Sequence, residues 1–126
     1  MAVGEVRLEV PASPEFLRMT RLTTAGVATR VGFSFDEIED LRIAIDEVCF
    51  ALMGKRGREG RLVLRYTLNP GEVVVEGTGH FDDDGEAEPT LLPLSSQILQ
   101  AVTDECFLEG SPDGPHFRLV KRRTGG

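Results

Sequence analysis

The stretch DEIEDLRIAIDEVCFALM, residues 36–53, gives the clearest structural signal in the chain. At about 100° per residue, its apolar side chains fall in a sector about 100° wide, which is typical of an amphipathic helix packed on a core. These side chains are those of Ile38, Leu41, Ile45, Val48, Cys49 and Leu52. The helix opens at Ser34-Phe35-Asp36, where we take Asp36 as the N-cap. The sequence therefore predicts a long helix that ends before the glycine-containing loop at 54–60.

On both sides of this helix the spacing of apolar residues predicts further elements. Residues 4–10 alternate between apolar and polar and predict a half-buried strand. A helix is expected over residues 14–32, with Gly32 as its stop. After the long helix, RLVLRYTLN (61–69) and VVVEG (73–77) predict an antiparallel hairpin around a tight turn.

The C-terminal third predicts a loop, a helix and a last strand. Residues 78–93 are polar and predict a loop, and HFRLVK (116–121) predicts the strand. A third helix is expected from the apolar pattern of Ile98, Leu99, Val102, Cys106 and Phe107. The order β-α-α-β-β-α-β predicts one α/β (α+β) domain, residues 1–126, built as a two-layer sandwich. We expect a four-stranded mixed or antiparallel sheet with three helices on one face and water on the other.

Size and charge exclude several classes of function. The chain has 126 residues, the usual size of one domain, and a net charge of −7. That charge argues against nucleic acid as a partner. Neither a signal peptide nor an apolar run near the roughly 18 residues of a membrane span is seen, so no membrane partner is expected. Cys49 and Cys106 lie in apolar patterns without partners at ligand spacing, which predicts reduced core thiols and a cytoplasmic protein.

Residues 40–49, DLRIAIDEVC, resemble the second helix of the anti-sigma-factor serine kinases, members of the histidine-kinase-like ATPase superfamily. That helix typically reads D-hydrophobic-R-hydrophobic-A-hydrophobic-x-E-A-C-T-N-A. The resemblance continues in order through residues 14–22, the hairpin, and residues 101–105 and 117–121. It implies the histidine-kinase-like ATPase fold, whose element order agrees with the order predicted above.

The nucleotide motifs of this family are mostly replaced. The resemblance implies that the magnesium-holding Asn falls on Ala51, and that the adenine-reading Asp falls on Gly77 of the triplet Gly77-Thr78-Gly79. The phosphate-binding glycine turn before the third helix reads Leu94-Ser95-Ser96-Gln97, and a Thr at the start of the last strand falls on Pro115. Only Glu47, in the place of the general base, and Gly79 are kept. By family position Gly77 and Gly79 are the cofactor-binding candidates, in degenerate form.

The loop that closes over the triphosphate in this family is acidic here. Residues 82–88 carry five acids and no base, namely Asp82, Asp83, Asp84, Glu86 and Glu88. Two like charges 4 Å apart cost about 4 kcal/mol at an effective dielectric near 20, so this loop would repel phosphates. The run also lacks the alternate spacing and distal Glu of a calcium loop, so we predict a solvated loop and no metal site.

We therefore expect an anti-sigma-factor-like regulatory protein that sequesters a sigma factor or an anti-anti-sigma (antagonist) protein, without ATP turnover and without a cofactor. Arg18 and Arg21 lie on one face of the first predicted helix and would form an exposed basic spot. By resemblance, Arg21 matches the arginine that the family presents to its partners.

Two alternatives remain open. The first is an active ATP-dependent serine protein kinase acting on an anti-anti-sigma factor, with ATP and Mg as cofactors and Glu47 as the catalytic base. Without kinase activity, Glu47 would be a relic. The second is a non-catalytic oligomerisation or sensing module. A homodimer through the sheet edge or the first helix is expected from family analogy alone.

Overall fold

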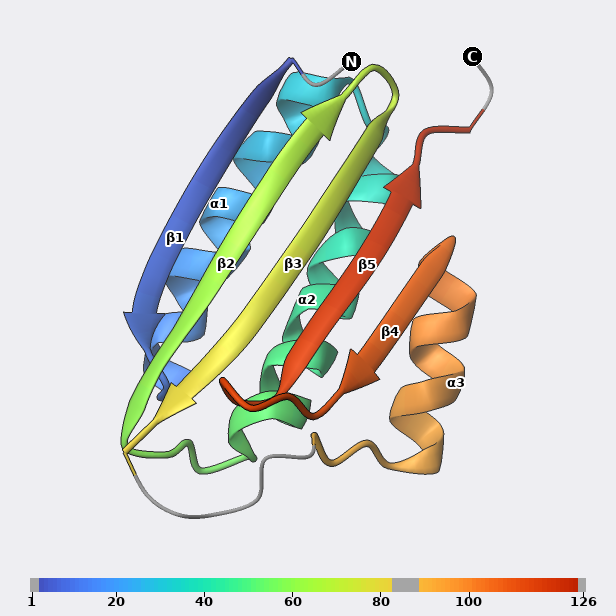
Figure 1. Cartoon of the computed structure of the whole chain (residues 1–126). Coiled ribbons are helices and arrows are strands. Elements are labelled where there is room, and N and C mark those ends of the chain that lie inside the picture. Colours follow the sequence, from blue (N-terminus) through green and yellow to red (C-terminus); the bar gives the residue numbers. More distant parts are fainter. Residues whose placement is uncertain (1–2, 83–88, 125–126) are drawn as a thin grey trace.

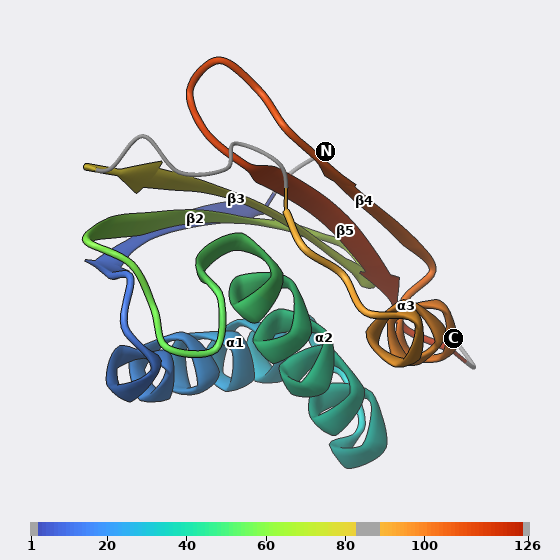
Figure 2. The same ribbon diagram turned by 90° about the horizontal axis from the view of Figure 1, so that it is seen from below.

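The computed structural model describes residues 3–82 and 89–124, which form one sheet with helices on one of its faces. The elements are β1 (Gly4–Pro11), a 3-10 turn (Pro14–Phe16), α1 (Leu17–Val31), α2 (Phe35–Met53), β2 (Gly60–Asn69), β3 (Glu72–Phe81), α3 (Pro93–Val102), β4 (Glu105–Glu109) and β5 (His116–Arg122). All neighbouring strands pair antiparallel, in the order β1-β2-β3-β5-β4. Figure 1 shows α1 and α2 behind the sheet, and Figure 2 shows the two layers edge-on, with α3 under the β4 edge.

The predicted two-layer α/β class is confirmed, but the prediction of four strands is wrong. The fifth strand is β4, which contains Cys106 and Phe107, two residues assigned to the third helix from sequence. The helix ends earlier, at Val102, because Thr103 is in an extended conformation (φ −124°, ψ 160°). The Asp104 amide then donates to the Val120 carbonyl over 2.9 Å, which starts the pairing of β4 with β5. A five-residue strand is too short for its apolar period to be distinguished from a helical one.

Two element boundaries also differ from the sequence-based expectation. The N-cap of α2 is Ser34, not Asp36: its hydroxyl accepts from the Glu37 amide while the Glu37 carboxylate accepts from the Ser34 amide. This reciprocal arrangement satisfies two amides that the helix leaves free. Strand β3 continues through Phe81, beyond the predicted loop start at residue 78. Of the acidic loop residues, Asp82 is exposed and those at 83–88 lie outside the described residues.

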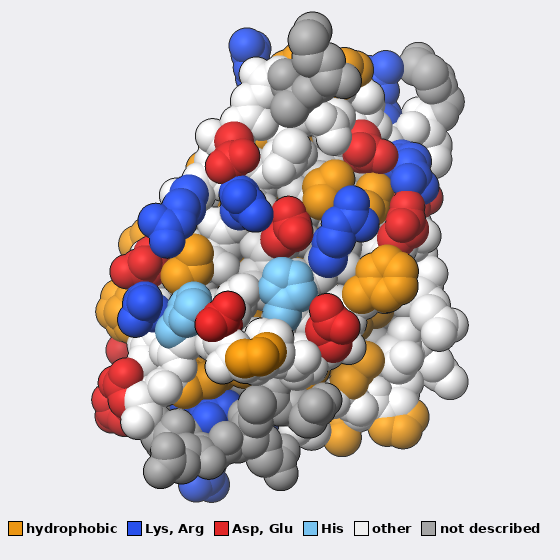
Figure 3. Space-filling model, in the orientation of Figure 1, with side chains coloured by type: hydrophobic (Ala, Val, Ile, Leu, Met, Phe, Trp, Pro, Cys, Tyr) orange, Lys and Arg blue, Asp and Glu red, His pale blue; other side chains and the backbone are white. Residues whose placement is uncertain are grey.

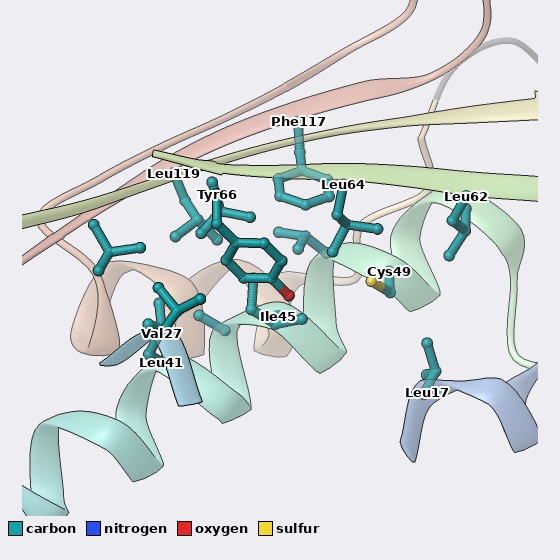
Figure 4. Close-up of a cluster of buried hydrophobic side chains, with 14 of the residues drawn as sticks. Leu17, Val27, Leu41, Ile45, Cys49, Leu62, Leu64, Tyr66, Phe117 and Leu119 are labelled. Carbon is teal, nitrogen blue, oxygen red and sulfur yellow. The ribbon is translucent and has the colours of Figure 1, made fainter. Parts of the chain in front are cut away.

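The core lies between the sheet and the pair α1 and α2. Figure 4 shows Tyr66, Leu64 and Phe117 pointing from the strands toward Ile45 and Cys49 of α2. The buried Tyr66 hydroxyl forms a hydrogen bond with the Thr24 hydroxyl of α1, at 2.8 Å. Burial raises the pKa of the Cys49 thiol to about 12 and that of Cys106 to about 11, which keeps both thiols protonated near neutrality.

The other face of the sheet carries interspersed acidic and basic side chains, as Figure 3 shows. Ion pairs join neighbouring strands across it, among them Arg65 with Glu76 at 3.8 Å and Arg122 with Glu72 at 3.1 Å. This agrees with the expectation of a sheet that is apolar toward the helices and polar on its other side. None of the helices in the described part of the chain is long and apolar enough to cross a membrane.

Glu37 fastens the C-terminal segment to the start of α2. Its carboxylate accepts from the amide of Thr124 at 2.7 Å and from the Thr124 hydroxyl at 3.0 Å, in addition to the Ser34 amide at 2.8 Å. Burial raises the pKa of this carboxyl, but the hydrogen bonds from Ser34 and Thr124 outweigh burial and lower it from 4.5 to about 2. The negative charge of Glu37 therefore stabilises the folded chain.

We predict that Glu37→Gln lowers the free energy of unfolding at pH 7 by about 1 kcal/mol or more, because it removes charge-assisted hydrogen bonds. Since the folded pKa lies below the unfolded one, this contribution is complete above pH 4.5 and is lost as the pH falls toward 2. Urea titrations of both proteins across this range should show their difference disappear.

The matched control is Glu39→Gln, which removes a more exposed carboxylate of the same helix that pairs with Arg42 at 2.7 Å. Its effect should stay below about 0.5 kcal/mol. An equal loss in both variants at pH 7 would contradict a special role for Glu37.

Candidate functional site

Glu47 and Ala51 on α2, which the resemblance places at the general base and the magnesium ligand, line one cavity of about 450 Å³. They lie four residues apart and thus on the same helix face, in the C-terminal half of α2. The volume lies in the range of small-molecule sites. The remaining lining residues come from the start of the 3-10 turn, the end of α2 and the loop after it, the segment before α3 and the first turn of α3. They are Pro14, Phe50, Gly54, Lys55, Thr90, Leu91, Leu92 and Ser95.

The cavity is mostly apolar. Among the described residues, its charged lining groups are Glu47 and Lys55. The nearby Ala51 carbonyl is already used, because it accepts from the Thr90 amide at 2.9 Å. That hydrogen bond holds the segment before α3 against the end of α2. A metal ion would need additional oxygen ligands here, and the described residues contain no group of three or more His, Cys, Asp or Glu side chains that could hold one.

Gly77, in the place of the family's adenine-reading Asp, faces an aromatic ring. It lies directly opposite Phe117 in the β3–β5 register, and a Cβ atom at residue 77 would overlap with the Phe117 ring. Phe117 is completely buried. The ring therefore occupies the space into which a side chain at position 77 would extend.

Gly79 is enclosed in the same way. A Cβ atom there would lie 2.5 Å from the Phe81 ring, and its amide donates to the carbonyl of the buried Pro115 at 2.9 Å. The two glycines thus lie on the core side of β3, packed against aromatic rings. Neither lines the cavity that contains Glu47.

The segment Leu94-Ser95-Ser96-Gln97 lies inside α3, whereas the sequence analysis put it in a turn before that helix. The Ser96 amide donates to the Leu92 carbonyl at 3.0 Å, as in a regular helix. A glycine-rich loop binds phosphate with amides that remain free, so this segment has lost part of that capacity. Together with Ala51 and the Gly77–Phe117 contact, this means that the described residues lack the magnesium ligand and the adenine-reading acid by which, on the resemblance, Mg-ATP would be held.

The partner-binding candidates Arg18 and Arg21 lie on α1 and are not among the residues that line this cavity. Arg18 is exposed, and Arg21, which was expected to be exposed beside it, forms an ion pair with an acid of α2. Its Nε atom lies 3.0 Å from both carboxylate oxygens of Asp46 on α2, and its side chain is 37% exposed. The ion pair therefore joins the two helices and neutralises much of the local positive charge.

Sequence reasoning missed Phe117 and Asp46. The replacement at Gly77 is visible in the sequence, but the residue that fills the space is known only once the β3–β5 register is known. Asp46 stands beside Glu47 without any distinguishing spacing, and its contact with Arg21 depends on how α1 and α2 cross.

His80 and His116 lie in strands β3 and β5, where the His116 Nδ1 atom lies 3.0 Å from the Thr78 hydroxyl.

Comparison with known proteins finds relatives that share a name. The chain is 36% identical over 101 residues to "Serine-protein kinase RsbW" of Bacillus pumilus (strain SAFR-032), covering 75% of this chain and 62% of that protein. It is 36% identical over 95 residues to the protein of the same name from Bacillus subtilis (strain 168), covering 71% and 59%. A third, from Bacillus licheniformis, is 31% identical over 101 residues, covering 76% and 63%. The matches thus span about three fifths of these relatives' length. No family profile matches the chain.

We predict that Gly77→Asp, which would restore the acid at this position, destabilises the fold by at least about 2 kcal/mol. The new side chain must displace the Phe117 ring and bury a carboxylate. Thermal or urea unfolding measures the loss. Adding Phe117→Ala should cost less in this background than in the wild type, because removal of the ring relieves the overlap that Gly77→Asp creates.

Gly4→Asp is the matched control in a strand, because a Cβ atom there meets no neighbour within 4 Å. It should cost clearly less than Gly77→Asp. If Gly77→Asp cost no more than this control, the space beside Gly77 would be open and the argument against adenine binding would fail.

Proposed function

We propose that the chain is an anti-sigma-factor-like regulator that works by binding. Its similarity to the proteins named RsbW supports membership of the anti-sigma-factor serine kinase family. It sequesters a sigma factor or an anti-anti-sigma protein by direct contact and does not turn over ATP. The partner and the absence of turnover are both part of this proposal, since the matches cover about three fifths of each relative.

The observation that carries the proposal is the packing of Phe117 against Gly77. A nucleotide-dependent member of the family reads adenine with an acid at this position and holds magnesium with an Asn at the position of Ala51. Here Gly77 has no room for a side chain, and Ala51 has no side-chain ligand atom. Binding of a protein partner requires neither group, so the fold keeps its interaction surfaces while the nucleotide site is lost.

The candidate interaction surface is the exposed side of α1. Arg18, Met19 and Leu22 are exposed there, and Arg21 reaches across to Asp46 of α2. Arginine with exposed apolar neighbours is the composition found at the centres of protein interfaces. By resemblance, Arg21 is also the family's partner-binding arginine.

The alternative is an active serine protein kinase. One observation favours it: Glu47, in the position of the general base, lines a cavity of a size that a small molecule could enter. The apolar walls and the poor fit to Mg-ATP argue against it. In the binding proposal, Glu47 is a half-buried acid without a catalytic role, and no cofactor is required.

The proposal is tested with the purified sigma factors and anti-anti-sigma proteins of the source organism. We predict that one of them binds with micromolar or tighter affinity, that Mg-ATP does not change this affinity, and that no phosphate is transferred to it. Calorimetry measures the affinity, and labelled ATP reports the transfer. Glu47→Gln should behave as the wild type in both measurements.

Phosphorylation of the partner by the wild type but not by Glu47→Gln would establish the kinase alternative. Failure of all these proteins to bind would contradict the proposed function itself.

A further inference from the structure

The ion pair between Arg21 and Asp46 lies at the molecular surface and not in the core. Its two side chains are 37% and 30% exposed. The pair joins α1 to α2 through the Nε atom of the guanidinium group. Both Asp46 oxygens lie 3.0 Å from the Nε atom. A charged group of each sign is thus held in a fixed place on the helical side of the molecule.

Both members of the pair keep unused hydrogen-bonding capacity. A guanidinium group has five N–H donors and a carboxylate has about four acceptor positions. Within residues 3–82 and 89–124, Asp46 is the one acid that pairs with Arg21, and it engages only the Nε atom. The terminal nitrogens of Arg21 can therefore receive a second carboxylate, and Asp46 can receive a second cation.

Exposed apolar side chains lie next to each member of the pair along its helix. Leu22 follows Arg21 on the exposed side of α1, and Ile43 lies one turn before Asp46 in α2. Their exposed fractions are 64% and 43%. Large apolar groups beside an arginine favour burial under a partner, because they exclude water from the charged contact.

Resting on the proposed function, we infer that the partner protein binds Arg21 and Asp46 at the same time, as one doublet of a positive and a negative charge. The partner surface carries an acidic side chain opposite the terminal nitrogens of Arg21 and a basic side chain opposite Asp46, with apolar groups covering Leu22 and Ile43. A partner with an acid alone would meet the charge of Asp46 beside that of Arg21. Asp46 therefore determines specificity, since it rejects surfaces that are only acidic.

The test exchanges the two charges. Arg21→Asp combined with Asp46→Arg keeps an ion pair between α1 and α2 but reverses the doublet that the partner meets. We expect the thermal midpoint to stay within about 3 °C of the wild type, because a partly exposed pair contributes little to stability. The affinity for the partner identified by the experiment above should fall at least tenfold, as measured by calorimetry.

The matched control exchanges a pair on the opposite face of the sheet, Arg65→Glu with Glu76→Arg, and should leave the affinity unchanged. A single variant, Asp46→Asn, provides an independent arm that needs no new ion pair to form. Here we expect affinity to fall at least threefold, because the partner's base loses its acceptor charge.

Unchanged affinity of the exchanged variant would overturn the inference. A gain in affinity for Asp46→Asn would also overturn it, because Asp46 would then only compete with the partner's acid for Arg21. Either result leaves the proposed function intact, because the wild type still binds. Absence of binding by the wild type overturns the proposed function, and this inference with it.

Discussion

The close contact between the Phe117 ring and the backbone of Gly77 is the constraint on which much of this structure depends. It joins β3 to β5 at a point where only glycine leaves room for the ring. The ring is fully buried and points toward α2, so it becomes part of the core between the sheet and the helices (Figure 4). The position that the resemblance assigns to adenine recognition thus contributes to folding here. Close-packed interiors do not accept an added side chain without displacement of their neighbours.

Helix α2 links this core to both candidate functional regions. Its first turn is fixed by the capping box of Ser34 and Glu37, and Glu37 also binds the C-terminal segment. Farther along, Asp46 reaches Arg21 on α1, while the adjacent Glu47 lines the cavity near the end of the helix. The two neighbouring acids therefore face different surroundings. Asp46 forms an ion pair at the surface, and Glu47 lines a mostly apolar cavity.

The sequence predicted the elements with long periodic patterns and failed where the pattern was short. Helix α2 and the β2–β3 hairpin were predicted because many residues support each of them. Strand β4 was missed, because Cys106 and Phe107 fit a helical spacing as well as an alternating one. At the candidate site, the losses at Ala51 and Gly77 were readable from the chain. The roles of Phe117 and Asp46 were not, because both depend on contacts between elements that are far apart in sequence.

The central claim of the proposed function is that this chain has the fold of the family but does not bind Mg-ATP. Titration of the protein alone with Mg-ATP in a calorimeter tests this claim most directly. The account predicts no binding tighter than the millimolar range, which corresponds to less than about 4 kcal/mol of binding free energy. Micromolar binding that depends on magnesium would contradict the account. It would mean that a nucleotide site forms despite Ala51 and the ring packed on Gly77.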